Sequence, residues 1–226
     1  MSQDSNHFVL PGDVISNGSS SLKQNVILEG DKLVSTTIGF TEINDGAVDV
    51  IALTGLYISA VDDLVIGKIV SHNALSWEVD INSSYRAMLP ASDIFGKDYS
   101  PSRDDLSLKL IIGDIVLARI VNSDSRRPLI TINGQNLGKI DDGELIKISP
   151  AKVPRLIGKH GSMIQSIEES TGASITIGQN GWIVVYCEKT NGLLKAIMAI
   201  RMVEEQAHIV DLTDKVKKML QSNGVE

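Results

Sequence analysis

The chain contains a single cysteine and no long apolar segment. These two features argue against a disulfide-rich protein and against one with a membrane-spanning helix. Cys187 is the only cysteine among 226 residues, so the chain cannot build a disulfide framework of its own. No apolar run approaches the ~20 residues that a membrane-spanning helix needs. Residues 1–6 lack the basic start and the apolar core of a signal peptide. We therefore expect no contact with a membrane and a location in the cytoplasm.

Aromatic residues are scarce throughout, and basic residues are scarce in the first quarter of the chain. Aromatic side chains make up 4% of the residues. Residues 1–62 contain two basic and eight acidic side chains, a net charge of −6, whereas the rest of the chain carries −1. This balance is unfavourable for binding nucleic acid, because neutralisation of phosphate by cations drives that affinity. A nucleic-acid site must therefore be local and lie after residue 62, and the acidic first part is expected to contact a protein.

Gly158 and Gly161 lie between two segments that both have helical apolar spacing. Pro154 suits the first turn of one segment, and Ser162 and Gln165 have the spacing of a capping box at the start of the other. Glycine lets the backbone itself touch a ligand, and the start of a helix offers N–H groups to a phosphate. We expect this turn to hold a sugar-phosphate backbone. The neighbouring residues that would add charge or donors are Lys152, Arg155, Lys159 and His160.

The segments around this turn have the order strand, two helices, two strands, helix. The predicted strands are residues 144–149, 173–178 and 182–187, and the predicted helices after the turn include 193–206 and a final one at 211–220. This order resembles a KH domain, whose G-x-x-G loop binds about four nucleotides of a single strand. The alternative is a helical hairpin in which the glycines only permit close packing.

Short β-like runs separated by turn residues fill the chain before residue 138. The first 61 residues predict a small β module. Its expected strands lie at 7–15, 25–29, 32–38 and 47–53, with hairpin turns at 29–31 and 44–46. Five further runs predict an OB-type barrel. They lie at 65–70, 76–81, 85–90, 113–121 and 126–132, with a short helical turn at 91–95.

The predicted barrel resembles the ribosomal S1 domain in three stretches, Val65-Ile-Gly-Lys-Ile-Val70, residues 113–120 (G-D-x-V-x-A-R-I) and residues 129–132 (L-I-T-I). Trp77 shares a face with Val79 and Ile81, so we expect it in the core and not stacked on RNA. The resemblance implies an RNA-binding face. Its candidate contacts, each of which has a solvated surface charge as the alternative reading, are Lys68, His72, Arg86, Arg119, Arg126 and Arg127.

The order β module, S1 barrel, KH domain resembles the ribosomal RNA-processing protein 4 family, the RNA-binding cap subunits of the archaeal exosome. The most specific stretches are residues 153–164 and 177–183, and Pro11-Gly-Asp13 also matches. The resemblance implies a multi-domain α+β chain with a ring-docking β domain, an S1 domain and a KH domain with a C-terminal helix. The domain borders that we expect are 1–61, 62–137 and 138–226.

The same resemblance implies a binding protein with no catalytic residues, no cofactor and no metal. Three copies of the chain would cap a ring of six exonuclease subunits and direct the 3′ ends of single-stranded RNA into it. The first domain would dock on the ring. The turn Gly178-Gln-Asn-Gly181 would be structural and would pack the KH domain against the barrel.

Two other functions stay open at the level of sequence. A nuclease would need carboxylates that converge on metal ions about 4 Å apart. The adjacent acidic pairs are Asp62-Asp63, Asp104-Asp105, Asp141-Asp142 and Glu168-Glu169, and all fall in predicted loops or on a helix surface, where solvated charge is the simpler reading. A transcription or translation factor can also join S1 and KH units, although such elongation factors usually carry two KH domains and only one is visible here.

Overall fold

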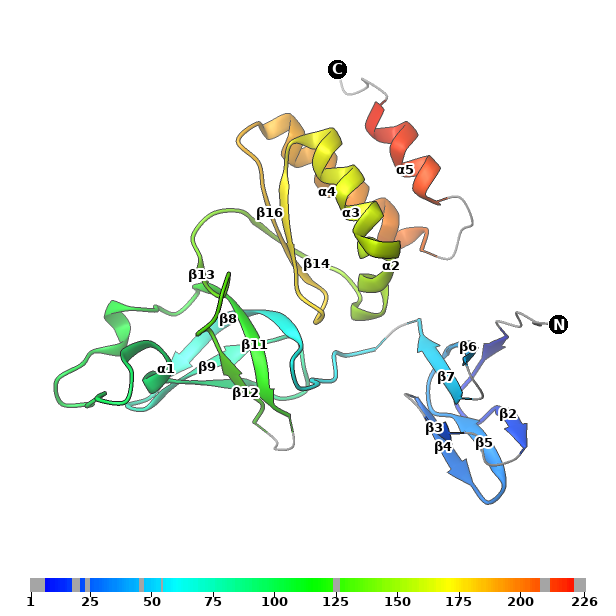
Figure 1. The fold of residues 1–226 in the computed structure, drawn as a ribbon, viewed down its shortest axis with the longest axis horizontal. Helices are drawn as coiled ribbons and strands as arrows, with labels where there is room; N and C mark the ends of the chain where they lie inside the picture. The colour runs from blue at the N-terminus through cyan, green and yellow to red at the C-terminus, as the bar shows by residue number, and fades with distance from the viewer. Residues whose placement is uncertain are drawn as a thin grey trace. The chain divides into compact units, whose positions relative to one another are not determined.

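A computed structural model describes residues 7–17, 21–22, 25–44, 47–53, 55–123, 127–207 and 212–221. The chain divides into two compact units, residues 1–55 and residues 56–226. Figure 1 shows the first unit as strands only, and the second as a strand-rich part followed by a part in which helices lie beside a small sheet. The multi-domain α+β class that the sequence predicts is confirmed.

The first unit consists of two small sheets, with the strand orders β1-β6-β7-β3 and β2-β5-β4. Their strands are β1 (Phe8–Val9), β2 (Val14–Asn17), β3 (Ser21–Leu22), β4 (Val26–Glu29), β5 (Lys32–Ser35), β6 (Gly39–Asn44) and β7 (Ala47–Ala52). The core of this unit is made by Val9, Val26, Leu33, Val48 and Val50. So small a core gives little stability, because a short chain buries little apolar surface.

The strand expected at residues 32–38 ends early, at Ser35, and the strand β6 is missing from the sequence-based prediction. The Ser35 hydroxyl donates to the carbonyl oxygen of Thr37 at 2.7 Å and accepts from the N–H of Thr37. Such a local turn competes with the strand ladder, so the chain bends before a new strand begins. Residues 45 and 46 of the turn expected at 44–46 lie outside the described residues.

The barrel of the second unit contains five strands, β8 (Leu64–His72), β9 (Ser76–Asp80), β10 (Ala87–Pro90), β11 (Ile115–Asn122) and β12 (Leu129–Thr131). Their order is β12-β10-β9-β8-β11, and a further β12–β11 pairing closes the sheet on itself. The short helices α1 (Ala91–Phe95) and η1 (Leu106–Leu108) lie between β10 and β11. This closed five-stranded barrel confirms the predicted OB-type fold.

The barrel core contains the side chains that strand alternation assigns to it. Trp77, Val79 and Ile81 are fully buried, and the indole N–H of Trp77 donates to the carbonyl oxygen of Leu110 at 3.1 Å. Gly67 lies opposite this row, where a Cβ would overlap the Val79 side chain. The glycine within the first barrel strand therefore makes room for the core.

Two segments beside the predicted domain borders take part in the barrel. Tyr57 is buried in the barrel core, and its hydroxyl donates to a carboxylate oxygen of Asp63. Burial, together with this hydrogen bond, raises the pKa of Tyr57. Strand β13 (Gly138–Ile140), which the sequence predicts as part of a turn-rich linker, pairs with β11. The borders at 61/62 and 137/138 stay predictions, and these contacts favour adding both segments to the barrel.

The last part of the chain has the predicted KH order. Its strands β14 (Glu144–Lys147), β15 (Ser174–Ile177) and β16 (Trp182–Tyr186) form an antiparallel sheet of order β14-β16-β15. Its helices are η2 (Pro150–Lys152), α2 (Val153–Ile157), η3 (Lys159–Gly161), α3 (Ser162–Thr171), α4 (Thr190–Glu205) and α5 (Leu212–Gln221). Both helices predicted after the sheet are therefore present, with ends within three residues of those expected.

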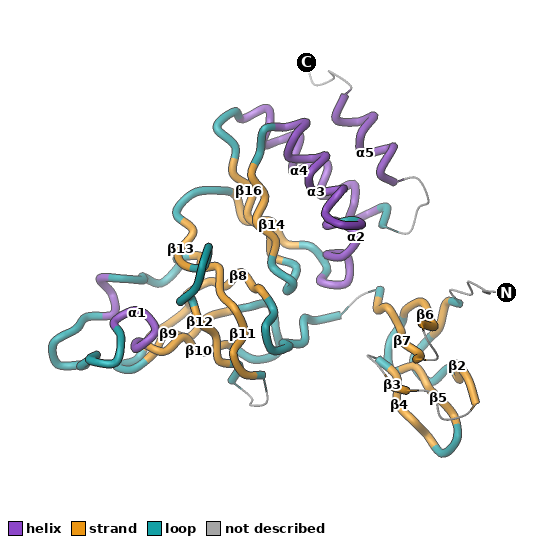
Figure 2. The backbone as a smooth tube through the Cα atoms, in the orientation of Figure 1, coloured by secondary structure: helices purple, strands orange, loops and turns teal. Residues whose placement is uncertain are grey.

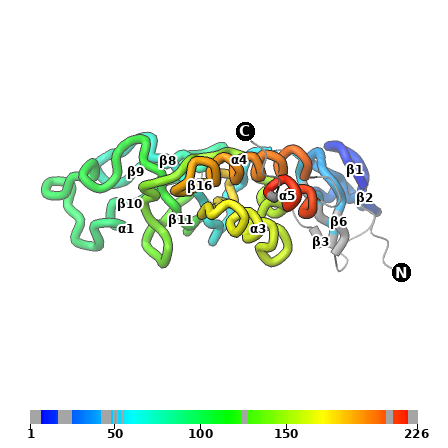
Figure 3. Tube along the Cα trace, turned by 90° about the horizontal axis from the view of Figure 1, so that it is seen from above, coloured from blue at the N-terminus to red at the C-terminus, as the bar shows by residue number. Residues whose placement is uncertain are grey.

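Helices α2, α3 and α4 lie along one face of this sheet, and α5 lies beside α3 and α4 (Figures 2 and 3). The side chains of Leu156, Ile167 and Ile183 are fully buried between helices and sheet. The predicted apolar stripe of the final helix, which includes Leu212 and Val216, is buried in the same core. This core fixes the ends of α2 and α3, and hence the turn between them.

Candidate nucleic-acid interface

The turn between α2 and α3 bends through residues with positive φ. Gly158 has φ 74° and ψ 175°, His160 has φ 52°, and Gly161 has φ 80° and ψ 7°. Gly161 occupies the N-cap position of α3, and no side chain caps the helix there. The predicted capping box is therefore wrong, because Ser162 already belongs to the helix. The exposed start of α3 leaves its backbone, and not a capping hydroxyl, facing outward.

Each glycine of the turn meets a different requirement. A Cβ on Gly158 would lie 2.8 Å from both the backbone nitrogen and the Cβ of Met163, so the chain crosses the first turn of α3 at close range. A Cβ on Gly161 would meet only Ile164, at 4.0 Å, so its requirement is the left-handed backbone and not space. Both features keep the bend tight and bare.

The turn lies at the surface, and its predicted basic residues surround it. Lys159 and His160 are exposed at the tip, Arg155 is exposed in the last turn of α2, and Lys152 is half-buried just before α2. The buried side chains of Leu156 and Met163 anchor the turn from below. The arrangement gives a polymer access to the backbone of the bend, with several cations beside it.

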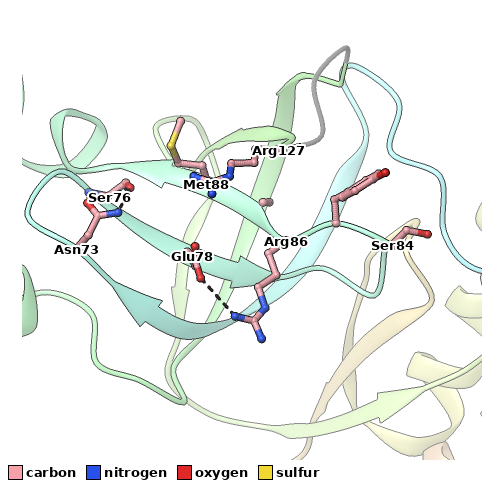
Figure 4. A pocket seen from close by; sticks show the side chains of 9 residues that line it. Asn73, Ser76, Glu78, Ser84, Arg86, Met88 and Arg127 are labelled. Carbon is pink, nitrogen blue, oxygen red and sulfur yellow. Dashed lines mark hydrogen bonds and ion pairs between the residues drawn. The ribbon is translucent and has the colours of Figure 1, made fainter.

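The basic residues predicted for the barrel do not form one site. Arg86 and Arg127 line the same hollow on the outer surface of the barrel (Figure 4). Arg119 instead donates to the carbonyl oxygen of Asp62 at 2.8 Å. Lys68 is exposed on β8, in the strand whose Ile66 packs against the KH domain. Arg126 lies outside the described residues.

Sequence reasoning missed the carboxylate in this hollow. The Glu78 carboxylate lies 3.3 Å from Arg86 and accepts from the Ser71 hydroxyl at 2.8 Å. These two contacts hold the pKa of Glu78 below its usual range. Strand alternation between Trp77 and Val79 points this side chain outward, and that alternation is the signal that could have located it.

A glycine-bounded turn joins the KH domain to the barrel, as the resemblance implies. The fully buried side-chain amide of Asn180 accepts from Ile66 N–H at 3.2 Å and donates to the carbonyl oxygens of Ile66 and Ile81 at 2.7 and 2.9 Å. Gln179 pairs with both backbone groups of Leu64. The structural role expected for residues 178–181 is confirmed.

The adjacent acidic residues have mostly structural partners. Asp104 accepts from Arg103, which lowers the pKa of its carboxyl, Asp105 accepts from Ser107, and Glu168 accepts from the N–H of Ile175. Within the described residues, no three His, Cys, Asp or Glu side chains are placed to hold a metal ion. Nor does any described helix combine the length and apolar character needed to cross a bilayer.

Comparison with known proteins places the chain in a family. The KH domain family model matches residues 143–202. An exosome complex component Rrp4 from Nitrosopumilus maritimus is 59% identical over 222 residues, covering 98% of both chains, and one from Thermofilum pendens is 39% identical over 217 residues, covering 94% of this chain and 92% of the relative. A crystal structure of a protein assigned as an exosome complex RNA-binding protein superposes with a TM-score of 0.70 at 38% identity, covering 74% of this chain and 96% of that one. The chain thus belongs to the Rrp4 family of exosome complex components.

Proposed function

We propose that the chain is a non-catalytic RNA-binding subunit of an archaeal exosome in the cytoplasm. Three copies cap a hexameric exonuclease ring and feed it the 3′ ends of single-stranded RNA for 3′–5′ degradation or processing. Membership of the Rrp4 family supports an exosome partner. The observation that carries the RNA-binding part is the bare, exposed turn from Gly158 to Gly161, at the start of a ten-residue helix.

The turn binds the phosphate backbone and not the bases. The positive end of the α3 dipole favours an anion at its N-terminus, and a glycine turn lets the sugar-phosphate chain approach the main chain closely. Lys159 and Arg155 supply charge beside it, with His160 as a further donor. A backbone clamp of this kind tolerates any sequence, which suits a subunit that delivers many different RNAs.

The barrel adds a second, weaker contact through Arg86 and Arg127. Tethered weak sites can raise overall affinity by a factor of about 10² when both engage one ligand. Three copies in a cap multiply this effect around the ring entrance. The RNA is thus held by several modest contacts, each of which releases easily as the strand moves.

The first unit docks on the ring. Its net charge is negative, and the exposed apolar side chains Phe8, Leu10, Val14, Ile27 and Leu28 suit a protein partner better than a nucleic acid. A small core that gains stability on binding agrees with this role. The three-domain division of the chain belongs to the same proposal, with the segments around Tyr57 and β13 added to the barrel.

The full chain is expected to bind labelled single-stranded RNA and to leave its length unchanged in the presence of Mg²⁺ or phosphate. Gel-shift and denaturing-gel assays on the same sample measure both properties. With exonuclease ring subunits added, size-exclusion chromatography should give one larger complex, and the RNA should then shorten. Shortening by the chain alone would favour the nuclease alternative, and recovery of RNA polymerase in place of ring subunits in a pull-down would favour the transcription-factor alternative.

A further inference from the structure

A hollow of about 260 Å³ on the outer surface of the barrel has a composition unlike that of a phosphate clamp. Pockets for drug-sized ligands usually measure roughly 300–1,000 Å³, so this one has room for a fragment about the size of a single base. It combines apolar, donor and acceptor groups. The lining residues that define it are Asn73, Glu78, Tyr85, Arg86, Met88 and Arg127.

Sheet register builds the floor of this hollow. Ser71 on β8 pairs with Glu78 on β9, and Glu78 pairs with Met88 on β10, so the three side chains form a row across the outer face of the barrel. The Met88 thioether gives a soft apolar surface, and Tyr85, which is 50% exposed, adds an aromatic ring. A flat ring placed here would find contacts for its face as well as for its edge.

Neighbouring side chains fix the orientation of the Glu78 carboxylate through contacts to one of its two oxygens. Ser71 and Arg86 both contact Oε2, and among the described residues Oε1 has no hydrogen-bond partner. Figure 4 shows the side chain reaching Arg86 in the middle of the hollow, with Asn73 and Ser76 toward one end and Ser84 toward the other. A glutamate side chain is ionised at neutral pH, and the Ser71 and Arg86 contacts lower the pKa of Glu78 further, so this carboxylate can only accept hydrogen bonds.

An ionised carboxylate repels a phosphate, so its place on an RNA-binding barrel suggests contact with a base edge. Guanine is the base whose Watson–Crick edge carries two adjacent donors, N1–H and the 2-amino group, beside a carbonyl acceptor, O6. The two lone pairs of Glu78 Oε1 can accept from these donors, and the Arg86 guanidinium, 3.3 Å from the same carboxylate, brings an N–H donor next to it for O6. Uracil instead presents a second carbonyl to the carboxylate.

We propose that this hollow is a nucleobase subsite in which Glu78 reads the donor edge of guanine, Arg86 donates to its O6, and Tyr85 and Met88 hold its ring. The subsite rests on the proposed function, because it needs RNA already held by the chain. It adds base preference to a subunit whose KH turn contacts only the backbone. RNA passing through the cap therefore dwells longer where a guanine enters the hollow.

The test uses the full chain and labelled RNA 12-mers of uridine with one central guanosine, inosine, adenosine, cytidine or uridine, with dissociation constants measured by fluorescence anisotropy. Guanosine should bind about fivefold to tenfold tighter than uridine, at the lower end of what one good base contact gives. Inosine, which lacks the 2-amino group, should fall between them. This comparison uses the parent chain, so it does not depend on how a variant folds.

The Glu78→Gln variant should reduce the guanosine preference to less than twofold and should raise affinity for all-uridine RNA, because one negative charge near the strand is removed. A Glu188→Gln variant, which neutralises an exposed carboxylate on the KH domain, serves as the matched control and should keep the preference. Equal affinity for all five RNAs overturns the subsite alone. Binding to none of them overturns the proposed function and the subsite with it, whereas an equal loss for every RNA in Glu78→Gln assigns Glu78 a structural role only.

Discussion

The Lys159→Asp, His160→Asp double variant is expected to bind single-stranded RNA at least about tenfold more weakly than the parent at moderate salt. Two carboxylates would replace two exposed donors at the start of α3, where we propose that the phosphate backbone binds. The slope of affinity against salt concentration should also become shallower by about one phosphate contact. Fluorescence anisotropy titrations at several salt concentrations measure both quantities.

Both substitutions are expected to leave the fold of the turn intact. Lys159 and His160 are exposed, and aspartate tolerates the left-handed backbone that His160 adopts at φ 52°. Aspartate at Gly158 would be a poorer test, because its Cβ would press on Met163 and could unfold α3. The matched control reverses charge at two exposed lysines of α5, Lys215 and Lys217. An equal loss of RNA binding in this control would mean that overall charge, and not the turn, sets the affinity.

The Asn180→Ala variant is expected to lower the free energy of unfolding by about 3 kcal/mol or more, because this side chain lies in the joint between barrel and KH domain. The substitution removes three hydrogen bonds and leaves backbone groups of Ile66 and Ile81 without their partner in a buried position. Urea denaturation followed by circular dichroism measures the change.

The neighbouring Gln179→Ala variant is the control for this prediction. Gln179 is exposed, and its side chain makes one hydrogen bond, from the N–H of Leu64 at 2.9 Å. Its loss should lower stability by about 1 kcal/mol or less. If the two variants were equally stable, the buried amide of Asn180 would not be what fastens the KH domain to the barrel.

The sequence predicts most of this fold because the relevant signals are local. The apolar spacing on either side of Gly158 and Gly161, and the alternation of Trp77 with Val79, need no knowledge of distant residues. Strand β13 has no such signal. It is three residues long, lies among turn residues, and forms because β11 offers it a backbone to pair with.

The same contrast between local signals and tertiary contacts applies to the candidate site. The KH turn is visible in the sequence, since its glycines and cations are neighbours along the chain. The barrel contacts depend on which side chains tertiary structure brings together: Arg119 donates to the Asp62 carbonyl, whereas Arg86 lies beside Glu78 in the hollow. A lone glutamate on the outer face of a strand looks like solvated charge until its partners from neighbouring strands are in place.

The most direct measurement of the central claim is an amide chemical-shift titration of the full chain with a short single-stranded RNA. If the bare turn holds the phosphate backbone, the largest shifts belong to the amides of residues 158–163, with smaller ones around Arg86 on the barrel. A titration that leaves these amides unmoved while others shift would contradict the assignment of the turn as the RNA clamp.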